Sequence, residues 1–132
     1  MKRTLSLLLV VIYLNVSGQV PQDSTASSEV SQPNLDWAYE LYPTQNMYMF
    51  LKLDTRNGRI WQVQYSMKED NRFENVLNMI PLVHEKDESV GRFKLYPTQN
   101  MYTYILLDRI NGYTYQIQWS HKYENRLVLP IY

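Results

Sequence analysis

Residues 41–48 read Leu-Tyr-Pro-Thr-Gln-Asn-Met-Tyr, and residues 95–102 repeat them without a change. The match continues without a gap when the chain is shifted against itself by 54 positions, and more than half of the positions from 40 to 72 equal their partners. Both copies also contain an Asn-Gly pair, which favours a hairpin because Asn and Gly tolerate positive φ. The chain therefore holds a tandem duplication of one strand–turn–strand unit.

Each copy predicts a meander of antiparallel strands rich in Tyr, Trp, Ile and Val. The expected strands are residues 37–42, 47–54 and 59–66, and then 91–96, 101–108 and 113–120. Two further apolar segments, 76–83 and 127–131, contain proline and are expected at sheet edges. Because a lone three-stranded sheet is marginal, we expect an all-β fold in which two tandem three- to four-stranded antiparallel meanders pack as a pseudo-two-fold sandwich or small open barrel.

The alternation of side chains along the strands predicts which face is buried. Apolar residues occupy almost all odd-numbered positions, which include Tyr39, Leu41, Met49, Leu51, Leu53, Trp61, Val63, Phe93, Leu95, Ile105, Leu107, Tyr115 and Ile117. Successive side chains of a strand point to opposite faces of the sheet. We therefore expect the odd-numbered faces of both copies to meet in the core and the more polar even-numbered faces to be exposed.

The N-terminal segment predicts export. Lys2 and Arg3 precede an apolar run over residues 5–14, and small residues follow up to Gly18, which is the layout of a cleaved secretory signal. The run is shorter than the ~20 residues that span a bilayer, so an uncleaved anchor is the less favoured alternative. We expect a signal peptide at 1–18 and a protein that is periplasmic or secreted.

Residues 19–34 are polar, with prolines, serines and threonines, and predict a flexible linker because they cannot bury enough apolar area to offset their ordering entropy. A single β domain over 35–132 is expected to follow, made of repeat 1 (37–83) and repeat 2 (91–132).

Composition excludes several functional classes. The chain has 13 basic and 13 acidic residues, and loss of Lys2 and Arg3 leaves 11 against 13, a net charge of −2. This is not the basic footprint of a nucleic-acid-binding protein. With no cysteine, the chain has no disulfide and no thiolate for metal or nucleophilic chemistry. Stability has to come from an aromatic core.

No set of residues predicts catalysis or a cofactor. Asp54 and Asp108 are equivalent in the two copies, but each precedes an Asn-Gly loop, where Asp commonly bonds the turn backbone. The two histidines, His84 and His121, occupy non-equivalent positions without the spaced partners of a metal site. No nucleophile elbow is present. We therefore expect a non-enzyme, with no metal and no cofactor.

The best candidate site is a set of tyrosine and glutamine residues on the even-numbered faces. Flat aromatic rings beside amides suit sugars or extended peptides, because rings supply apolar contact and amides supply paired donors and acceptors. Cross-strand pairing that stiffens a solvent-facing sheet is the structural alternative. The candidate residues are Tyr48, Gln62, Gln64, Tyr102, Tyr104, Gln116 and Gln118.

The stretch 53–62, LDTRNGRIWQ, resembles the LDTxTGxxWQ hairpin of small, uncharacterised exported bacterial proteins. It is also similar to the Asp-x-x-Thr-Gly…Trp hairpin of quinoprotein-type β-propeller blades, although Asn57 replaces the threonine and the tryptophan of those blades falls one residue later. The resemblance implies a β-hairpin and carries over no activity and no quinone-binding residue.

Two functions follow from these patterns. The first is an exported, non-enzymatic β module that binds a peptide, protein or glycan on the Tyr/Gln face. The alternative is a structural subunit that assembles into a homo-oligomer through sheet edges or faces, such as a ring of blades.

Overall fold

The computed structural model of the chain describes residues 37–132. The expected signal peptide at 1–18 and linker at 19–34, as well as the expected start of the β domain at residue 35, lie outside the described residues.

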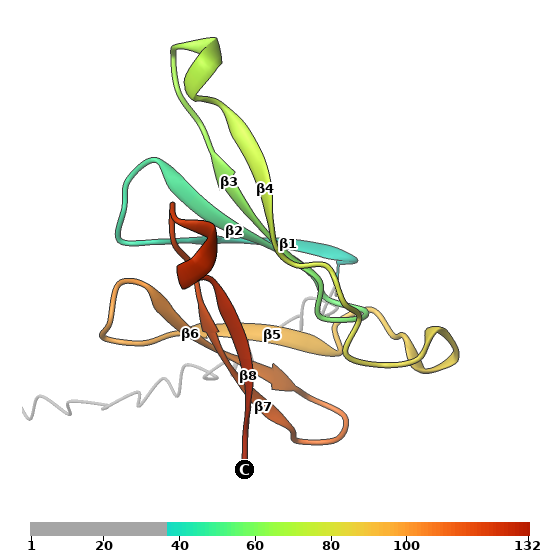
Figure 1. Cartoon of the computed structure of the whole chain (residues 1–132). Helices are drawn as coiled ribbons and strands as arrows, with labels where there is room; N and C mark the ends of the chain where they lie inside the picture. Colours follow the sequence, from blue (N-terminus) through green and yellow to red (C-terminus); the bar gives the residue numbers. More distant parts are fainter. Residues whose placement is uncertain (1–36) are drawn as a thin grey trace, which may run out of the picture. The chain divides into compact units, whose positions relative to one another are not determined.

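The described residues form two separate four-stranded antiparallel sheets, one for each repeat (Figure 1). Sheet 1 has the order β1-β2-β3-β4 and consists of β1 (Tyr39–Pro43), β2 (Met49–Asp54), β3 (Ile60–Gln64) and β4 (Phe73–Asn78). Sheet 2 has the order β5-β6-β7-β8 and consists of β5 (Phe93–Pro97), β6 (Thr103–Asp108), β7 (Thr114–Gln118) and β8 (Leu127–Ile131). The all-β class and the two antiparallel meanders are thus confirmed.

Three single-turn 3₁₀ helices complete the described elements: η1 (Glu69–Asn71), η2 (Glu85–Asp87) and η3 (Tyr123–Asn125). Among residues 37–132 there is no helix with the length and apolar character to cross a bilayer.

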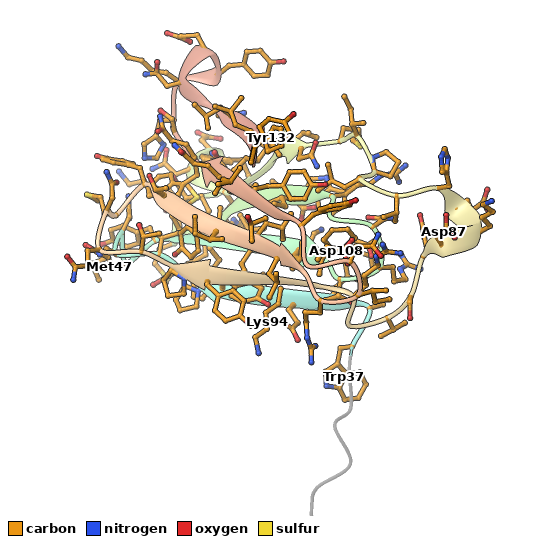
Figure 2. The ribbon with its side chains drawn as sticks, turned by 90° about the horizontal axis from the view of Figure 1, so that it is seen from below. Trp37, Met47, Asp87, Lys94, Asp108 and Tyr132 are labelled. Carbon is orange, nitrogen blue, oxygen red and sulfur yellow. The ribbon has the colours of Figure 1, made fainter. Side chains whose placement is uncertain are left out.

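The turns of the two repeats are built alike because their residues are the same. Thr44 Oγ1 donates to the Met49 carbonyl at 2.9 Å, and Asn46 Oδ1 accepts from the Tyr48 backbone N–H at 3.0 Å. Repeat 2 reproduces both bonds with Thr98 and Asn100. These turns lie at one end of the sheets and the Asn-Gly loops at the other, as the positions of Met47 and Asp108 show (Figure 2).

The fourth strand of repeat 1 lies earlier in the chain than expected. The apolar segment 76–83 predicted an edge strand, whereas β4 covers Phe73–Asn78 and ends before Pro81. The Asn78 amide closes the strand by donating to the carbonyls of Gly58 and Ile80, both at 2.9 Å. In repeat 2 the edge strand β8 lies where it was expected, over Leu127–Ile131.

The expectation that the odd-numbered faces of both repeats meet is wrong. Except at the irregularity where Ile60 lies opposite Asn78, the cross-strand pairs join an odd-numbered residue to an even-numbered one, as Leu51 opposite Gln62 and Leu106 opposite Tyr115 show. Residues that pair across strands share a face, so the buried parity switches from strand to strand. In sheet 1 the buried residues are odd in β2, such as Leu51, and even in β3, such as Ile60. In β6, which is equivalent to β2, the even residue Leu106 is buried because the opposite face of the sheet is covered.

We call the two faces of each repeat front and back, using equivalent positions in both. The front carries Met49, Leu51, Leu53, Ile60 and Gln62 in repeat 1, and Thr103, Ile105, Leu107, Thr114 and Gln116 in repeat 2. The back carries Tyr39, Leu41, Phe50, Trp61, Val63 and Tyr65 in repeat 1, and Phe93, Leu95, Tyr104, Tyr115, Ile117 and Trp119 in repeat 2.

The core forms between the front of sheet 1 and the back of sheet 2. Its buried members are Met49, Leu51, Leu53 and Ile60 from the first and Phe93, Leu95, Tyr104, Leu106, Ile117 and Trp119 from the second. A two-fold axis would bring equivalent faces together, whereas these repeats stack front to back. Burial of each large apolar side chain contributes ~1.5–3 kcal/mol, so this shared core is what stabilises two sheets that are marginal alone.

Candidate functional site

The predicted Tyr/Gln residues do not share one surface. Gln62 and Tyr104 are buried at 0% and 4% exposure, while Tyr48 and Tyr102 are half exposed at 50% and 44%. The remaining three glutamines, Gln64, Gln116 and Gln118, are partly buried. The front-to-back stacking explains why Gln62 and Gln116 differ, because it covers the front of sheet 1, which carries Gln62, and leaves the front of sheet 2, which carries Gln116, on the outside.

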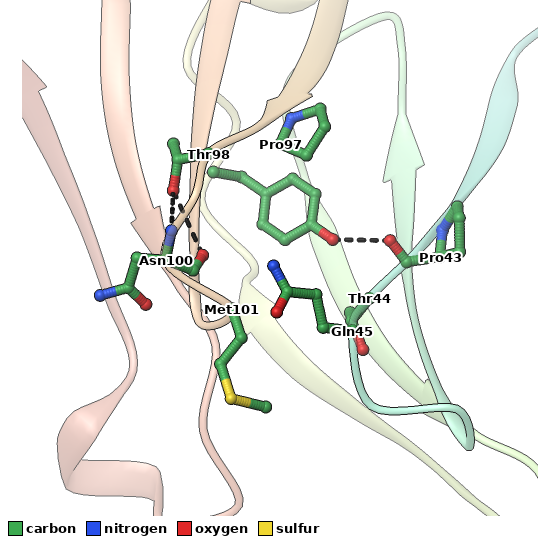
Figure 3. Close-up of a pocket in the computed structure, with 8 residues that line it drawn as sticks. Pro43, Thr44, Gln45, Pro97, Thr98, Asn100 and Met101 are labelled. Carbon is green, nitrogen blue, oxygen red and sulfur yellow. Dashed lines mark hydrogen bonds between the residues drawn. The ribbon is translucent and has the colours of Figure 1, made fainter.

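Gln62 and Tyr104 act as structural links between the repeats. The Gln62 amide donates through Nε2 to the Ser120 carbonyl and accepts through Oε1 from the Ser120 N–H, both at 3.0 Å. The Tyr104 hydroxyl donates to the Pro43 carbonyl at 2.6 Å (Figure 3). Burial raises the pKa of Tyr104. These polar atoms are satisfied inside the protein, so they serve the fold.

A small pocket lies at this seam, between the identical turns of the two repeats. Its volume is about 170 Å³, and Pro43, Thr44, Pro97, Asn100 and Tyr104 are among the residues that line it (Figure 3). That volume suits a few water molecules rather than a drug-sized ligand, which needs ~300 Å³ or more.

Four of the predicted residues line a pair of equivalent grooves. The repeat-1 groove has a volume of about 380 Å³ and is lined by Tyr48, Gln64, Tyr65, Ser66, Met67, Lys68 and Asn71. The repeat-2 groove has a volume of about 370 Å³ and is lined by Tyr102, Gln118, Ser120, His121, Lys122 and Asn125. Each of the six positions in the repeat-2 groove has its counterpart 54 residues earlier in the repeat-1 groove, which Tyr65 lines in addition. The duplication has therefore produced two copies of one concave site.

Both grooves are held open by the same hydrogen bonds. Gln64 Nε2 donates to the Asn71 carbonyl at 2.9 Å, and Gln118 Nε2 donates to the Asn125 carbonyl at 3.0 Å. These bonds tie the end of the third strand to the 3₁₀ turn that follows it. The Ser66 hydroxyl accepts from the Lys68 N–H at 3.1 Å, and Ser120 and Lys122 repeat this contact at 3.2 Å. The loop that forms each wall is thus preorganised.

A tyrosine lines the opposite side of each groove and packs against a second aromatic ring, which is Tyr65 on the surface of repeat 1 and the buried Trp119 in repeat 2. The rings of Tyr48 and Tyr65 lie 5.7 Å apart at 58° in repeat 1, and those of Tyr102 and Trp119 lie 5.1 Å apart at 51° in repeat 2. The Trp119 indole also contacts His121 edge-on at 5.8 Å. Each half-exposed tyrosine is therefore fixed in position and presents part of its ring and its hydroxyl beside the lysine and glutamine of the same groove.

Sequence reasoning found the tyrosine and glutamine of each groove and missed the serine, lysine and asparagine. The signal for these three was present, since Ser66, Lys68 and Asn71 are identical to their counterparts in repeat 2. Identity between the copies at the end of the third expected strand and just after it pointed to a shared local structure there.

Asp54 and Asp108 have the turn role that their position predicted. Asp54 Oδ1 accepts from the Arg56 N–H at 3.0 Å, and Asp108 Oδ1 accepts from the Ile110 N–H at 2.9 Å. Each carboxylate also binds an arginine: Asp54 binds Arg56, and Asp108 binds Arg92, both at 2.8 Å. Burial by itself raises the pKa of both aspartates, but the arginine and backbone donors outweigh it and hold each pKa below its ordinary value.

A further hollow, of about 530 Å³, surrounds the Asp54–Arg56 pair. Tyr39, Trp61, Arg59, Glu85 and Glu88 are among the residues that line it, so charges of both signs are mixed there. The Arg59 Nε is buried without a hydrogen-bond partner.

Within residues 37–132, no three His, Cys, Asp or Glu side chains gather closely enough to hold a metal ion. His84 immediately precedes η2, and His121 lines the repeat-2 groove.

Comparison with known proteins gives no relative for this chain: no protein-family model, no curated protein and no solved structure matches it. The similarity of residues 53–62 to other LDTxTGxxWQ hairpins therefore stays a prediction about local structure. Function has to be argued from the site itself.

Proposed function

We propose that the protein is an exported, non-enzymatic β module that binds a glycan through its two equivalent grooves. Export rests on the signal-like residues 1–18. The observation that carries the binding proposal is the repetition of one concave site, with the same tyrosine, glutamine, serine, lysine and asparagine in each copy.

The chemistry of each groove suits a sugar ring. A half-exposed tyrosine ring supplies the flat apolar contact that the C–H face of a sugar prefers, and the phenol, amide and ammonium groups supply hydrogen bonds to hydroxyl groups. Volumes of about 380 and 370 Å³ leave room for a ligand of one or two sugar units. Lys68 and Lys122 favour a sugar that carries an acidic group.

The duplication favours a repeating ligand over a single small molecule. Two like sites on one chain gain from a ligand that presents the same group many times, because the second contact is then intramolecular. A polysaccharide has this property. A peptide fits it only if the peptide is itself repetitive.

The ion-paired state of the aspartates supports a non-catalytic role. A carboxyl group whose pKa is held below its ordinary value is ionised at neutral pH and is a poor proton donor. Neither aspartate is among the residues that line the two grooves.

Glycan and peptide arrays followed by calorimetry test the proposal. We expect hits among glycans with a repeating unit, and a calorimetric stoichiometry of two short oligosaccharides per chain. Lys68→Ala together with Tyr48→Ala should abolish one site and leave a stoichiometry of one. Lys122→Ala with Tyr102→Ala is the matched change in repeat 2. Loss of a stacking ring and a hydrogen bond is expected to weaken binding at the altered site by about tenfold or more.

Tyr102 also packs against Trp119, so its loss could affect folding. Thermal unfolding of each variant is the control that tests whether the sheets remain intact. Glycan binding that survives all four substitutions, or array hits confined to non-repetitive peptides, would refute the glycan site.

A further inference from the structure

The front-to-back core leaves two apolar faces uncovered, the back of sheet 1 and the front of sheet 2. On the back of sheet 1, Tyr39, Leu41 and Tyr65 are exposed at 51%, 60% and 50%. Their equivalents on the back of sheet 2 are Phe93, Leu95 and Trp119, each exposed at only 1% because sheet 1 covers them. The same face is thus core in one repeat and surface in the other.

The front of sheet 2 shows the same relation. Ile105 and Leu107 are partly buried, while their equivalents Leu51 and Leu53 are fully covered at 0% exposure. Neighbouring side chains add to the uncovered area, with Tyr96 opposite Ile105 and exposed at 43%. Exposed large apolar side chains gathered on one face of a sheet are typical of an interaction site.

The polar contacts that join the repeats use residues that both repeats possess. Gln62 of repeat 1 binds the backbone of Ser120 through two hydrogen bonds of 3.0 Å. Arg126 Nη1 donates to the carbonyl of Val76 at 3.2 Å.

Each of these four partners has its counterpart on an uncovered face. Gln116, on the front of sheet 2, is equivalent to Gln62, and Ser66, at the end of the back of sheet 1, is equivalent to Ser120. Arg72 is equivalent to Arg126, and the carbonyl of Pro130 is equivalent to that of Val76. The groups that form the contact between the two repeats are therefore present a second time, on the front of sheet 2 and the back of sheet 1.

We propose that a second copy of this chain docks on the first by repeating the internal contact, with the front of sheet 2 of one copy against the back of sheet 1 of the next. Gln116 then binds the Ser66 backbone of the neighbouring copy, and Arg72 of that copy reaches the Pro130 carbonyl. Ile105 and Leu107 pack against Leu41 and Phe50.

Such an interface is heterologous, because two different surfaces meet. Heterologous contacts produce a closed ring if the rotation closes and an open stack if it does not. Each copy contributes two sheets, so the product is a continuous series of four-stranded sheets.

One difference makes the contact between copies weaker than the contact within a copy. Lys52 and Glu74, which form an ion pair on the back of sheet 1, stand where repeat 2 has Leu106 and Val128. Docking removes water from this pair, which offsets part of the apolar gain. We therefore expect association that depends on concentration in the micromolar range or above.

The proposal does not rest on glycan binding. The repeat-1 groove remains open although repeat 2 covers the front of the sheet on which Gln64 lies. The equivalent repeat-2 groove is expected to stay open in the same way.

Two complementary variants test the mode of docking. Leu41→Glu places a charge on the back of sheet 1, where the side chain is already 60% exposed, so the monomer should fold normally. Ile105→Glu places a charge on the front of sheet 2. Sedimentation velocity and light scattering on the purified chain from about 1 to 500 µM measure the mass, and circular dichroism and thermal unfolding show that each variant is folded.

We expect the unmodified chain to grow from monomer to dimer and larger species, and each variant alone to remain monomeric. A mixture of the two should give a one-to-one complex that grows no further, because the intact front of the Leu41→Glu variant meets the intact back of the Ile105→Glu variant. Gln116→Ala should weaken association by about tenfold, through loss of its two hydrogen bonds.

Three results would overturn the proposal. The first is an unmodified chain that stays monomeric at the highest concentration. The second is a Leu41→Glu variant that still forms a homodimer, which indicates a front-to-front contact. The third is a mixture of the two variants that contains only monomers.

Discussion

Substitution of Gln62 by alanine is expected to destabilise the domain far more than the same substitution at its equivalent, Gln116. Gln62 is fully buried between the repeats and its amide makes two hydrogen bonds to the backbone of Ser120. Gln116 is only partly buried, on the outer front of sheet 2. The two residues have the same side chain in the same local strand, so the comparison isolates the tertiary contact.

The size of the effect follows from what the substitution leaves behind. The Ser120 carbonyl keeps a second donor, because Arg126 Nε lies at 2.8 Å. The Ser120 N–H loses the Gln62 acceptor, and a buried donor without a partner costs about 1–3 kcal/mol. The loss of side-chain packing adds to this cost. We therefore expect Gln62→Ala to lower the free energy of unfolding by about 2–4 kcal/mol, and Gln116→Ala to lower it by less than about 0.5 kcal/mol.

Equilibrium urea denaturation at a chain concentration well below the micromolar range measures both free energies of unfolding without a contribution from association. Thermal unfolding gives an independent measure, since 1 kcal/mol shifts the midpoint of a domain of this size by about 4–8 °C. If the two variants lose the same stability within about 0.5 kcal/mol, the Gln62 amide does not join the two sheets, and the front-to-back core is wrong.

Two further predictions concern stability. The Asp108 carboxylate is paired with buried Arg92. Its pKa lies below the ordinary value of 3.8, because the donors of Arg92 and of the backbone outweigh burial. The contribution of this carboxylate to the free energy of unfolding is therefore present above about pH 4 and is lost as the pH falls through the folded-state pKa. In urea titrations, Asp108→Asn should lower the free energy of unfolding by about 3 kcal/mol at pH 7 and by progressively less toward pH 3. A loss of stability that does not depend on pH would show that Asp108 is not the ionised partner of Arg92. Gly112→Ala should lower the free energy of unfolding by about 1–2 kcal/mol, because the backbone φ is +76° there although no atom lies near the added Cβ. Gly58→Ala should lower it by more, because the added Cβ would lie 2.8 Å from Leu82 Cδ1. Equal losses of stability in thermal unfolding would show that Leu82 moves aside freely.

Most of the local structure was predictable from the sequence because its causes are local. The Asn-Gly pairs and the Pro-Thr-Gln-Asn turns set the chain reversals, and seven of the eight strands lie within two residues of their expected bounds. The Asp54 and Asp108 turns follow from the same short-range bonding. The edge strand β4 was misplaced because its end depends on the Asn78 amide, which binds Gly58 in a different loop.

The candidate site was only half predictable. Tyr48, Gln64, Tyr102 and Gln118 line the grooves, as their exposure on the even-numbered positions suggested. Gln62 and Tyr104 were included by the same rule and are buried. Tyr104 is buried because the back of sheet 2 is the covered face, and Gln62 is buried because the register of its hairpin exchanges the parity of the buried face between β2 and β3. That register is a property of paired strands and cannot be seen along a single strand.

The sequence alone determined that this is a duplicated antiparallel β protein, because period-two alternation, turn residues and the repeated octet act within one unit. Only the tertiary structure decided which face of each unit is core. Leu41 and Leu95 lie in the same eight-residue sequence, yet one is exposed at 60% and the other at 1%. The reason is that burial depends on the neighbouring sheet, and in a front-to-back stack of two repeats each repeat has its neighbour on the opposite side.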